Sequence, residues 1–99
     1  MMAVKVIIDR KVKKGKEPGF ANLLRGMRGK AISCKGYISG ETLRALNDPN
    51  NYIVIFTWLS VEDWNNWEKS PERKRIHNKI EKLMARPSES SESKVYVNA

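Results

Sequence analysis

The chain has 99 residues, 40% apolar and 30% charged, which is typical of a soluble globular protein, and we expect one domain spanning residues 1–99. Its longest apolar run, Tyr52–Phe56, is too short to cross a bilayer, and we expect no secretory signal at its start. Its one cysteine, Cys34, excludes an internal disulfide. We therefore expect a cytoplasmic protein without a membrane partner. The net charge of +8 is spread along the chain, mostly opposite the expected apolar helix stripes, which favours a solvated surface over a nucleic-acid-binding one.

The first half of the chain predicts a strand, a helix and a second strand. Val4–Val12 is rich in β-branched residues and predicts the first strand. Pro18 suits the first turn of a helix, and Gly36 marks the exit from it. Tyr37–Leu46 predicts the second strand, and Asn47–Asn51 has the composition of a turn. The helix between them has one apolar face at helical spacing, made of Phe20, Leu23, Leu24, Met27 and Ala31.

The second half begins with the strongest strand pattern of the chain, Tyr52–Leu59, whose nearly continuous apolarity predicts burial on both faces. With the preceding strand it forms a hairpin over Tyr37–Leu59. Ser60 is a suitable cap for a short helix, Val61–Lys69, with Asp63 as its capping-box partner, and Ser70 followed by proline begins another helix. The apolar stripe of that helix consists of Ile76, Ile80, Leu83 and Met84.

The element order identifies the fold class. Pro87 stops the last helix, residues 88–93 form a polar loop, and Lys94–Val97 predicts a final strand. The order β-α-β-β-α-β, with its second helix broken in two, predicts an α+β, ferredoxin-like fold with an antiparallel sheet and helices on one face. Because the strands carry apolar residues on both alternations, we expect the other face to stack on a second copy, giving a homodimer.

Two segments carry a family resemblance, GYISGETL at residues 36–43 and TWLSVEDWNNWEKSPERKRIH at residues 57–77. They resemble the antibiotic biosynthesis monooxygenase domain family over nearly the whole chain, most specifically from Trp58 to Ser70. The resemblance implies a dimeric α+β barrel with a cleft between the helices and the sheet of each subunit. Some members oxygenate aromatic polyketides or quinols with O2 and without metal or flavin. It therefore implies a monooxygenase that acts on a small aromatic or quinol-like substrate and needs no cofactor.

One subgroup of that family, the IsdG-like heme-degrading monooxygenases, carries a tryptophan and, ten residues later, a histidine that ligates heme iron. Trp67 and His77 have this spacing. The resemblance to this subgroup implies that Trp67 is the pocket tryptophan and that His77 is the metal ligand if heme binds, with Arg73 among the basic residues facing the propionates. The subgroup also uses an asparagine on the first strand, where this chain offers Asp9 and no asparagine.

The predicted catalytic residues, Trp67, His77 and Asp9, each have an ordinary structural alternative. His77 lies at the edge of its apolar stripe, as a half-exposed helix histidine would. Trp67 and Trp64 are three residues apart and could both pack in the core. Asp9 on an apolar strand is either ion-paired or faces a pocket. Other polar candidates for the site are Asn65, Asn66, Tyr37 and Arg73.

Four functions fit this sequence. The first is an oxygenase without a cofactor, and the second is a heme-binding or heme-degrading protein. The third is a dimeric binding or sensing module without chemistry, an alternative that the missing asparagine leaves open. The fourth is an RNA-binding module of the same element order, but Tyr52–Leu59 lacks the glycine and basic residue expected there, so we expect no nucleic-acid partner.

Overall fold

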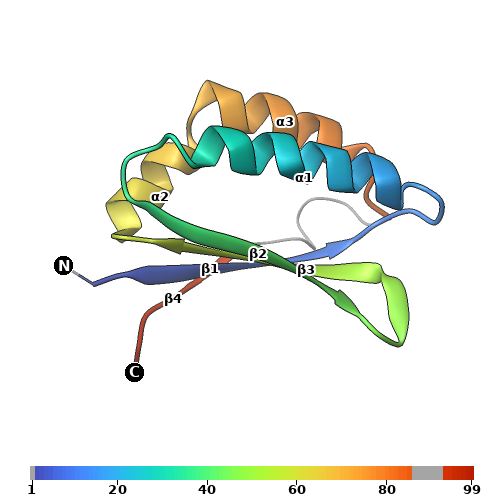
Figure 1. Ribbon diagram of the computed structural model, residues 1–99, viewed down its shortest axis with the longest axis horizontal. Coiled ribbons are helices and arrows are strands. Elements are labelled where there is room, and N and C mark those ends of the chain that lie inside the picture. The colour runs from blue at the N-terminus through green and yellow to red at the C-terminus, as the bar shows by residue number, and fades with distance from the viewer. Residues whose placement is uncertain (1, 86–92) are drawn as a thin grey trace.

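The computed structural model describes residues 2–85 and 93–99. Its strands form one antiparallel sheet in the order β2-β3-β1-β4, and the helices lie on one face of it (Figure 1). The ferredoxin-like order and the broken second helix are confirmed. The elements are β1 (Val4–Lys11), α1 (Glu17–Ala31), β2 (Tyr37–Ala45), β3 (Asp48–Trp58), α2 (Val61–Glu68), α3 (Pro71–Glu81) and β4 (Ser93–Tyr96).

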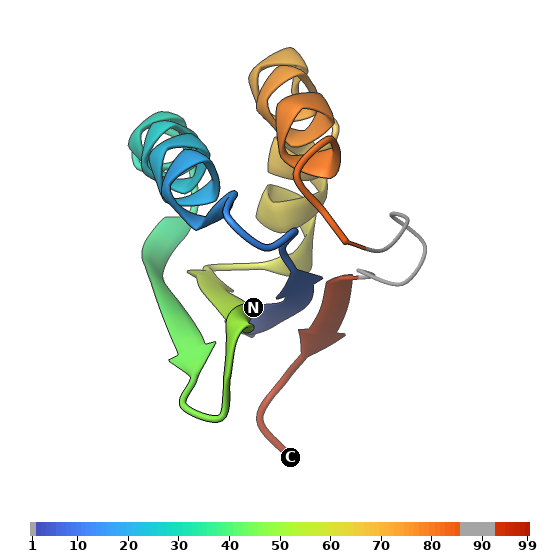
Figure 2. The same ribbon diagram turned by 90° about the vertical axis from the view of Figure 1, so that its right-hand side faces the viewer.

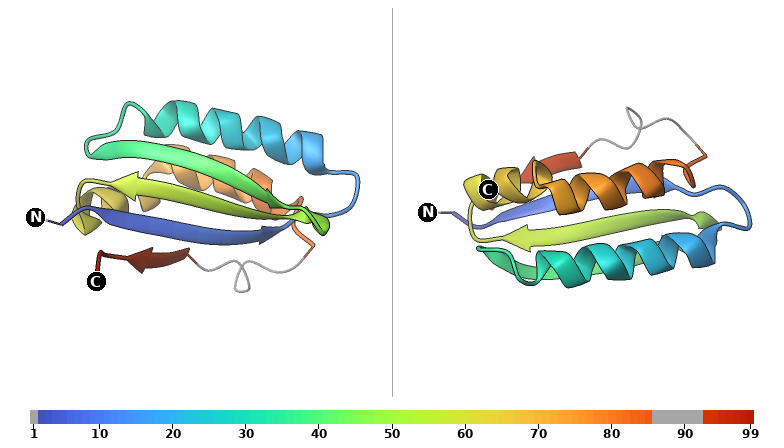
Figure 3. Two further views of the ribbon diagram at one scale, coloured as in Figure 1. Left: turned by 60° about the horizontal axis from the view of Figure 1, so that its bottom comes forward. Right: turned by 90° about the horizontal axis from the view of Figure 1, so that it is seen from above.

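The helices divide the sheet between them. Seen end-on, α1 lies over the β2 side and α3 over the side of β1 and β4 (Figure 2). From below the sheet the strands come forward and the helices lie behind them, so the second face has no helix (Figure 3). We call this second face the open face.

Alternation along the central strands determines what faces the helices. Val4, Val6 and Ile8 of β1 are buried toward the helices, and the intervening residues lie on the open face. On α1 the predicted apolar face is confirmed, with Leu23 only partly buried. The core between the layers is completed by Phe20, Leu24, Met27, Ala31, Val54, Phe56, Trp58, Trp64, Trp67, Ile80 and Met84.

Serine caps begin both short helices, as predicted. The Ser60 hydroxyl accepts a hydrogen bond from the backbone N–H of Asp63 (3.2 Å), and the Ser70 hydroxyl accepts one from that of Arg73 (3.2 Å). The α3 helix ends at Glu81, earlier than its apolar stripe predicted. Met84 stays buried because it bridges to Val12 outside the helix.

The predicted turn at residues 47–51 is wrong in extent. The turn is Leu46–Asn47, and β3 already begins at Asp48. Ala45 pairs with Asp48 but Arg44 pairs with Tyr52, so three residues bulge away from β2. Pro49 has no N–H to donate to β2, which explains the interruption of this ladder. The same stretch contacts the end of β1 instead, where the carbonyl of Asn50 accepts a 2.9 Å hydrogen bond from the Val12 N–H.

Within one protomer, β3 is not buried on both faces, because Ile53 and Ile55 on the open face are only half-buried. Of the predicted loop 88–93, residues 88–92 lie outside the described residues, as does Pro87, and Ser93 already belongs to β4. Within residues 2–85 and 93–99, no helix has the length and apolarity needed to traverse a membrane.

Gly36 gives a direct test of this packing. Its φ is +87°, and a Cβ there would overlap the carboxylate of Asp63. Gly36→Ala should therefore lower the free energy of unfolding by about 3 kcal/mol, from backbone strain plus the overlap. Gly15 has a similar φ of +86° but open space around it, so Gly15→Ala should cost only about 1 kcal/mol. Urea unfolding measures both, and equal losses would contradict the proposed contact.

Candidate functional site

Three tryptophans meet where β3 passes into α2. Trp58 ends β3 on its helix-facing side, and Trp64 and Trp67 project from α2 onto it because positions three apart share one side of a helix. The Trp58 and Trp67 rings stack with centroids 6.2 Å apart, and Trp58 and Trp64 lie 6.3 Å apart. All three are at most 2% exposed. The indole N–H groups of Trp58 and Trp67 have no acceptor among the described residues.

A small cavity lies beside Trp67, and we call it the Trp67 cavity. Its volume is about 190 Å³. It is formed where the connection from α1 to β2 runs past α2. Its walls are Trp67, Asp63 and Asn66 from α2, Ser70 from the start of α3, and Cys34 and Lys35 from the α1–β2 connection.

Asp63 places a buried carboxylate on the wall of this cavity. The residue is 7% exposed, and its Oδ2 accepts a 3.0 Å hydrogen bond from the Ser60 hydroxyl. Gly36 allows the carboxylate to approach the backbone because it has no side chain. Sequence reasoning assigned Asp63 only a capping role. The spacing from Ser60 could not show that a distant glycine leaves room for the carboxylate.

Cys34 contributes a thiol to the same cavity. Burial, followed by the charge of Glu72, raises the pKa of this thiol, so it stays protonated at neutral pH. The chain has no second cysteine and no histidine lines this cavity, so the thiol has no partner there for a nucleophilic dyad. The cavity walls therefore carry a carboxylate, an ammonium group, an amide, a hydroxyl, a thiol and an indole.

His77 belongs to a different cluster, which lies between α3 and β1. Its Nδ1 accepts a hydrogen bond from Arg10 Nη2 (3.2 Å), and its Nε2 faces Glu81 Oε1 at 2.9 Å. Arg10 is 3% exposed and also approaches Glu81, with Nη1 3.6 Å from Oε1. Arg73 is 8% exposed and lies over the Trp64 ring, 5.5 Å from its centroid. The cluster thus holds two buried guanidinium groups around one imidazole.

The electrostatics keep His77 neutral. Burial, then the positive charges of Arg10 and Arg73, lower its pKa to about 4. Because Nδ1 accepts the hydrogen bond, the ring proton sits on Nε2, which faces Glu81. Burial also lowers the pKa of both arginines, against the opposing charge of Glu81 at Arg10 and of Glu68 and Glu81 at Arg73. Both histidine nitrogens are therefore engaged by neighbouring side chains.

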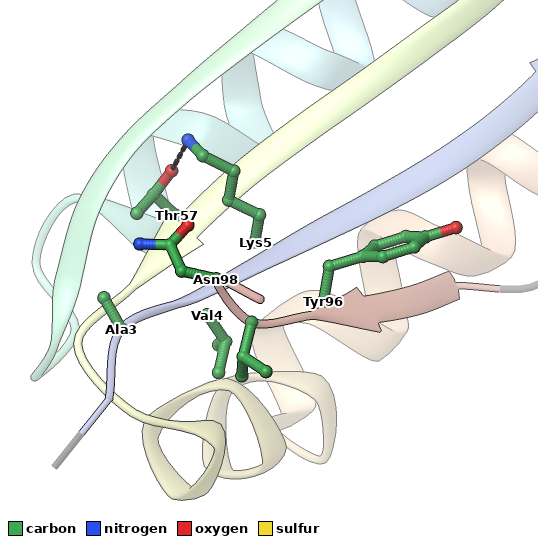
Figure 4. A pocket seen from close by; sticks show the side chains of 7 residues that line it. Ala3, Val4, Lys5, Thr57, Tyr96 and Asn98 are labelled. Carbon is green, nitrogen blue, oxygen red and sulfur yellow. Dashed lines mark hydrogen bonds between the residues drawn. The ribbon is translucent and has the colours of Figure 1, made fainter.

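Asp9 lies on the open face, away from both clusters. It is exposed and pairs in register with Ile53, opposite the helix-covered side. A shallow hollow of about 100 Å³ occurs on the same side at the other end of β1, where Lys5 donates a 3.2 Å hydrogen bond to Thr57 beside Tyr96 and Asn98 (Figure 4). The three predicted catalytic residues, Trp67, His77 and Asp9, thus do not form one site.

The comparison with known proteins agrees with this architecture. The family model described as antibiotic biosynthesis monooxygenase matches residues 3–79. The chain belongs to the antibiotic biosynthesis monooxygenase family. No curated protein matches it.

Solved structures of this fold come from several organisms. SnoaB, a cofactor-independent oxygenase from Streptomyces nogalater, is 15% identical with a TM-score of 0.87 over 100% of this chain and 95% of that one. A proposed antibiotic biosynthesis monooxygenase from Nitrosomonas europaea is 16% identical with a TM-score of 0.87 over 98% and 90%. A conserved protein from Methanosarcina mazei is 18% identical with a TM-score of 0.83 over 99% and 92%. At such identities these likenesses show the fold alone.

The residues of this family member do not fit heme in the way the IsdG-like subgroup implies. An axial ligand needs a free imidazole nitrogen, and Arg10 and Glu81 occupy both nitrogens of His77. Trp67 is packed on Trp58, and His77 is not among the residues that line the Trp67 cavity. Arg73 rests on Trp64 instead of facing an open space. Among the described residues no cluster of three or more metal-ligating side chains occurs.

The protonation of His77 can be followed directly because it is the only histidine. Its Cε1–H resonance should titrate with a midpoint near pH 4 instead of the usual 6.5. Since the unfolded chain takes up this proton first, stability should fall as the pH is lowered from 6.5 toward 4. His77→Gln should lose that part of the pH dependence in urea unfolding. A midpoint near 6.5 would show that the imidazole is not held as described.

Proposed function

We propose that the protein is a monooxygenase that uses O2 without a cofactor on a small aromatic or quinol-like substrate bound in the Trp67 cavity. Family membership and the fold shared with SnoaB, which is described as a cofactor-independent oxygenase, support this class of reaction. The observation that carries the proposal is the wall of the cavity, which includes both the buried Asp63 and the buried Trp67.

The walls of the cavity suit a hydroxylated ring. Its volume of about 190 Å³ is below that of typical drug-sized pockets, so it favours a small substrate. Trp67 provides an apolar wall for a ring, and its indole N–H lacks a partner that a substrate oxygen could supply. Asp63 would accept the proton of the substrate hydroxyl, and Asn66 and Ser70 would hydrogen-bond the ring substituents.

Deprotonation is the contribution that this chemistry needs from the protein. A phenolate or enolate gives an electron to O2 far more readily than the neutral substrate does. One oxygen atom then enters the substrate, and the other leaves as water with two hydrogen atoms of the substrate. Exclusion of bulk water by the α1–β2 connection would protect the intermediates. In this proposal His77 and Asp9 touch no reacting atom.

We also propose that the protein acts as a homodimer through the open face. Apolar residues of that face remain accessible: Ile7, Ile53 and Ile55 on the central strands are half-buried, and Leu43 and Tyr96 on the edge strands are 50% and 48% exposed. The same face carries Asp9 and Glu41 as well as Lys5, Lys11 and Lys94. A twofold interface places identical surfaces together, so residues of both signs can pair across it.

Oxygen uptake tests the proposed reaction. A panel of hydroquinones and hydroxylated polycyclic aromatics should give consumption of O2 with at least one member. Asp63→Asn keeps an acceptor for Ser60 but removes the base, so kcat should fall by about 100-fold. Glu62→Gln removes a neighbouring exposed carboxylate and should leave the rate unchanged. No uptake across the panel, or equal losses in both variants, would count against the proposal.

Sedimentation tests the proposed dimer. Ile55→Glu places a charge at the centre of the open face and should weaken self-association by at least about 100-fold, because an unpaired carboxylate would be buried. Asn78→Glu adds the same charge on an exposed position of α3 and should leave the dimer intact. A wild-type protein that sediments as a monomer at micromolar concentration would refute the interface.

A further inference from the structure

A second cavity, separate from the Trp67 cavity, lies between α1 and the edge strand β2, and we call it the Arg28 cavity. Its volume is about 180 Å³. It occurs on the side of the sheet where α1 is the only helix above the strands, and β2 has no neighbouring strand beyond it (Figure 2). It is lined by Phe20, Ala21, Leu24, Arg25 and Arg28 of α1, Thr42 of β2 and Tyr52 of β3.

The helix spacing explains why these residues converge. Positions 20, 21, 24, 25 and 28 form one stripe along α1, since each step of three or four residues returns to the same side. Phe20 and Leu24 are the buried inner margin of the stripe, and Arg25 is its exposed outer margin. On the sheet, Thr42 and Tyr52 face the helices. The result is an apolar floor with a basic rim.

The rim carries charge that the described residues do not neutralise. Two guanidinium groups line the cavity and no acidic residue does. Arg28 Nη2 donates a 2.7 Å hydrogen bond to Thr42 Oγ1, while its Nε–H is shielded from solvent without an acceptor. Arg25 is bonded to the neutral side chain of Asn22. A buried donor without an acceptor is unfavourable, so the Arg28 guanidinium lacks a partner that an incoming anion could provide.

The floor of the cavity selects for a flat apolar group. The rings of Phe20 and Tyr52 lie 4.9 Å apart with an interplanar angle of 53°, and Leu24 completes the surface beside them. Such a surface binds an aromatic ring through its face or edge. A carboxylate is the planar anion that matches the fork of an arginine, and the hydroxyls of Thr42 and Tyr52 can donate to the same oxygens.

We propose that the Arg28 cavity binds a small aromatic carboxylate, with the carboxylate on Arg28 and Arg25 and the ring against Phe20 and Tyr52. Arg28 would turn its fork from Thr42 toward the ligand, which would give the unpartnered N–H an acceptor. This site is independent of the oxygenase chemistry proposed above, because it shares no residue with the Trp67 cavity.

Titration with benzoate, followed by ¹⁵N amide shifts, tests the site. Saturable shifts should centre on Ala21, Arg28 and Thr42. Benzamide, which has the ring but no charge, should bind at least about tenfold more weakly, and so should inorganic phosphate, which has the charge but no ring. Equal binding of either probe, shifts without saturation, or shifts centred on Asp63 and Asn66 would overturn the proposal.

Variants separate this site from general attraction to a basic protein. Arg28→Gln should weaken benzoate binding by at least about tenfold, whereas Arg75→Gln, which removes the same charge from an exposed position on α3, should leave it unchanged. Ala21→Phe fills the cavity without changing the charge and should also abolish the shifts. This second variant keeps the test valid if the Arg28 variant folds poorly. Equal affinity in the wild type and either cavity variant would refute the site. Asp63→Asn should bind benzoate as the wild type does. The benzoate result therefore tests the Arg28 cavity whether or not the oxygenase proposal holds.

Discussion

The contact between Trp58 and the two tryptophans of α2 is the constraint on which the rest of the site depends. A ring system of this size buries a large apolar area, and the connection between β3 and α2 is too short to let the helix move far from the strand. Stacking Trp67 on Trp58 fixes the rotation of α2 about its axis. That rotation turns Asp63 toward the α1–β2 connection, where Gly36 leaves room for its carboxylate. The Trp67 cavity is thus a consequence of how an indole core is packed.

The buried charges between α3 and β1 follow a different rule. Arg10 occupies a helix-facing position of β1, where it needs partners because an isolated buried cation is very unfavourable. The imidazole of His77 and the carboxylate of Glu81 supply them one helical turn apart. The spacing between Trp67 and His77, which resembles that of a heme-ligating pair, is therefore explained here by packing. Trp67 packs against Trp58 on β3, and His77 accepts a hydrogen bond from Arg10 on β1.

Sequence patterns predicted the fold well because each relevant signal is local. Apolar residues that alternate along the chain predicted the strands, and apolar residues three or four positions apart predicted the helices. Ser60 and Ser70 predicted the N-terminal caps of α2 and α3. The site was less predictable because it depends on contacts between distant residues, such as Asp63 with Gly36. One signal was available in the sequence: Val4, Val6 and Ile8 share an alternation with Arg10 and not with Asp9. Reading that alternation would have assigned Arg10 to the helix side and Asp9 to the open face.

The two helix-side cavities differ in the charge that their walls leave unbalanced, and this difference determines what each can bind. The walls of the Trp67 cavity carry one carboxylate, that of Asp63, and one ammonium group, that of Lys35, so they favour a neutral ligand that carries a hydroxyl. In the Arg28 cavity two guanidinium groups have no opposing acid, so the walls favour an anion. By the same charge argument, an aromatic carboxylate would be disfavoured beside Asp63 and favoured beside Arg28. The two proposed sites would therefore bind neutral and anionic aromatic ligands at separate places on one small domain.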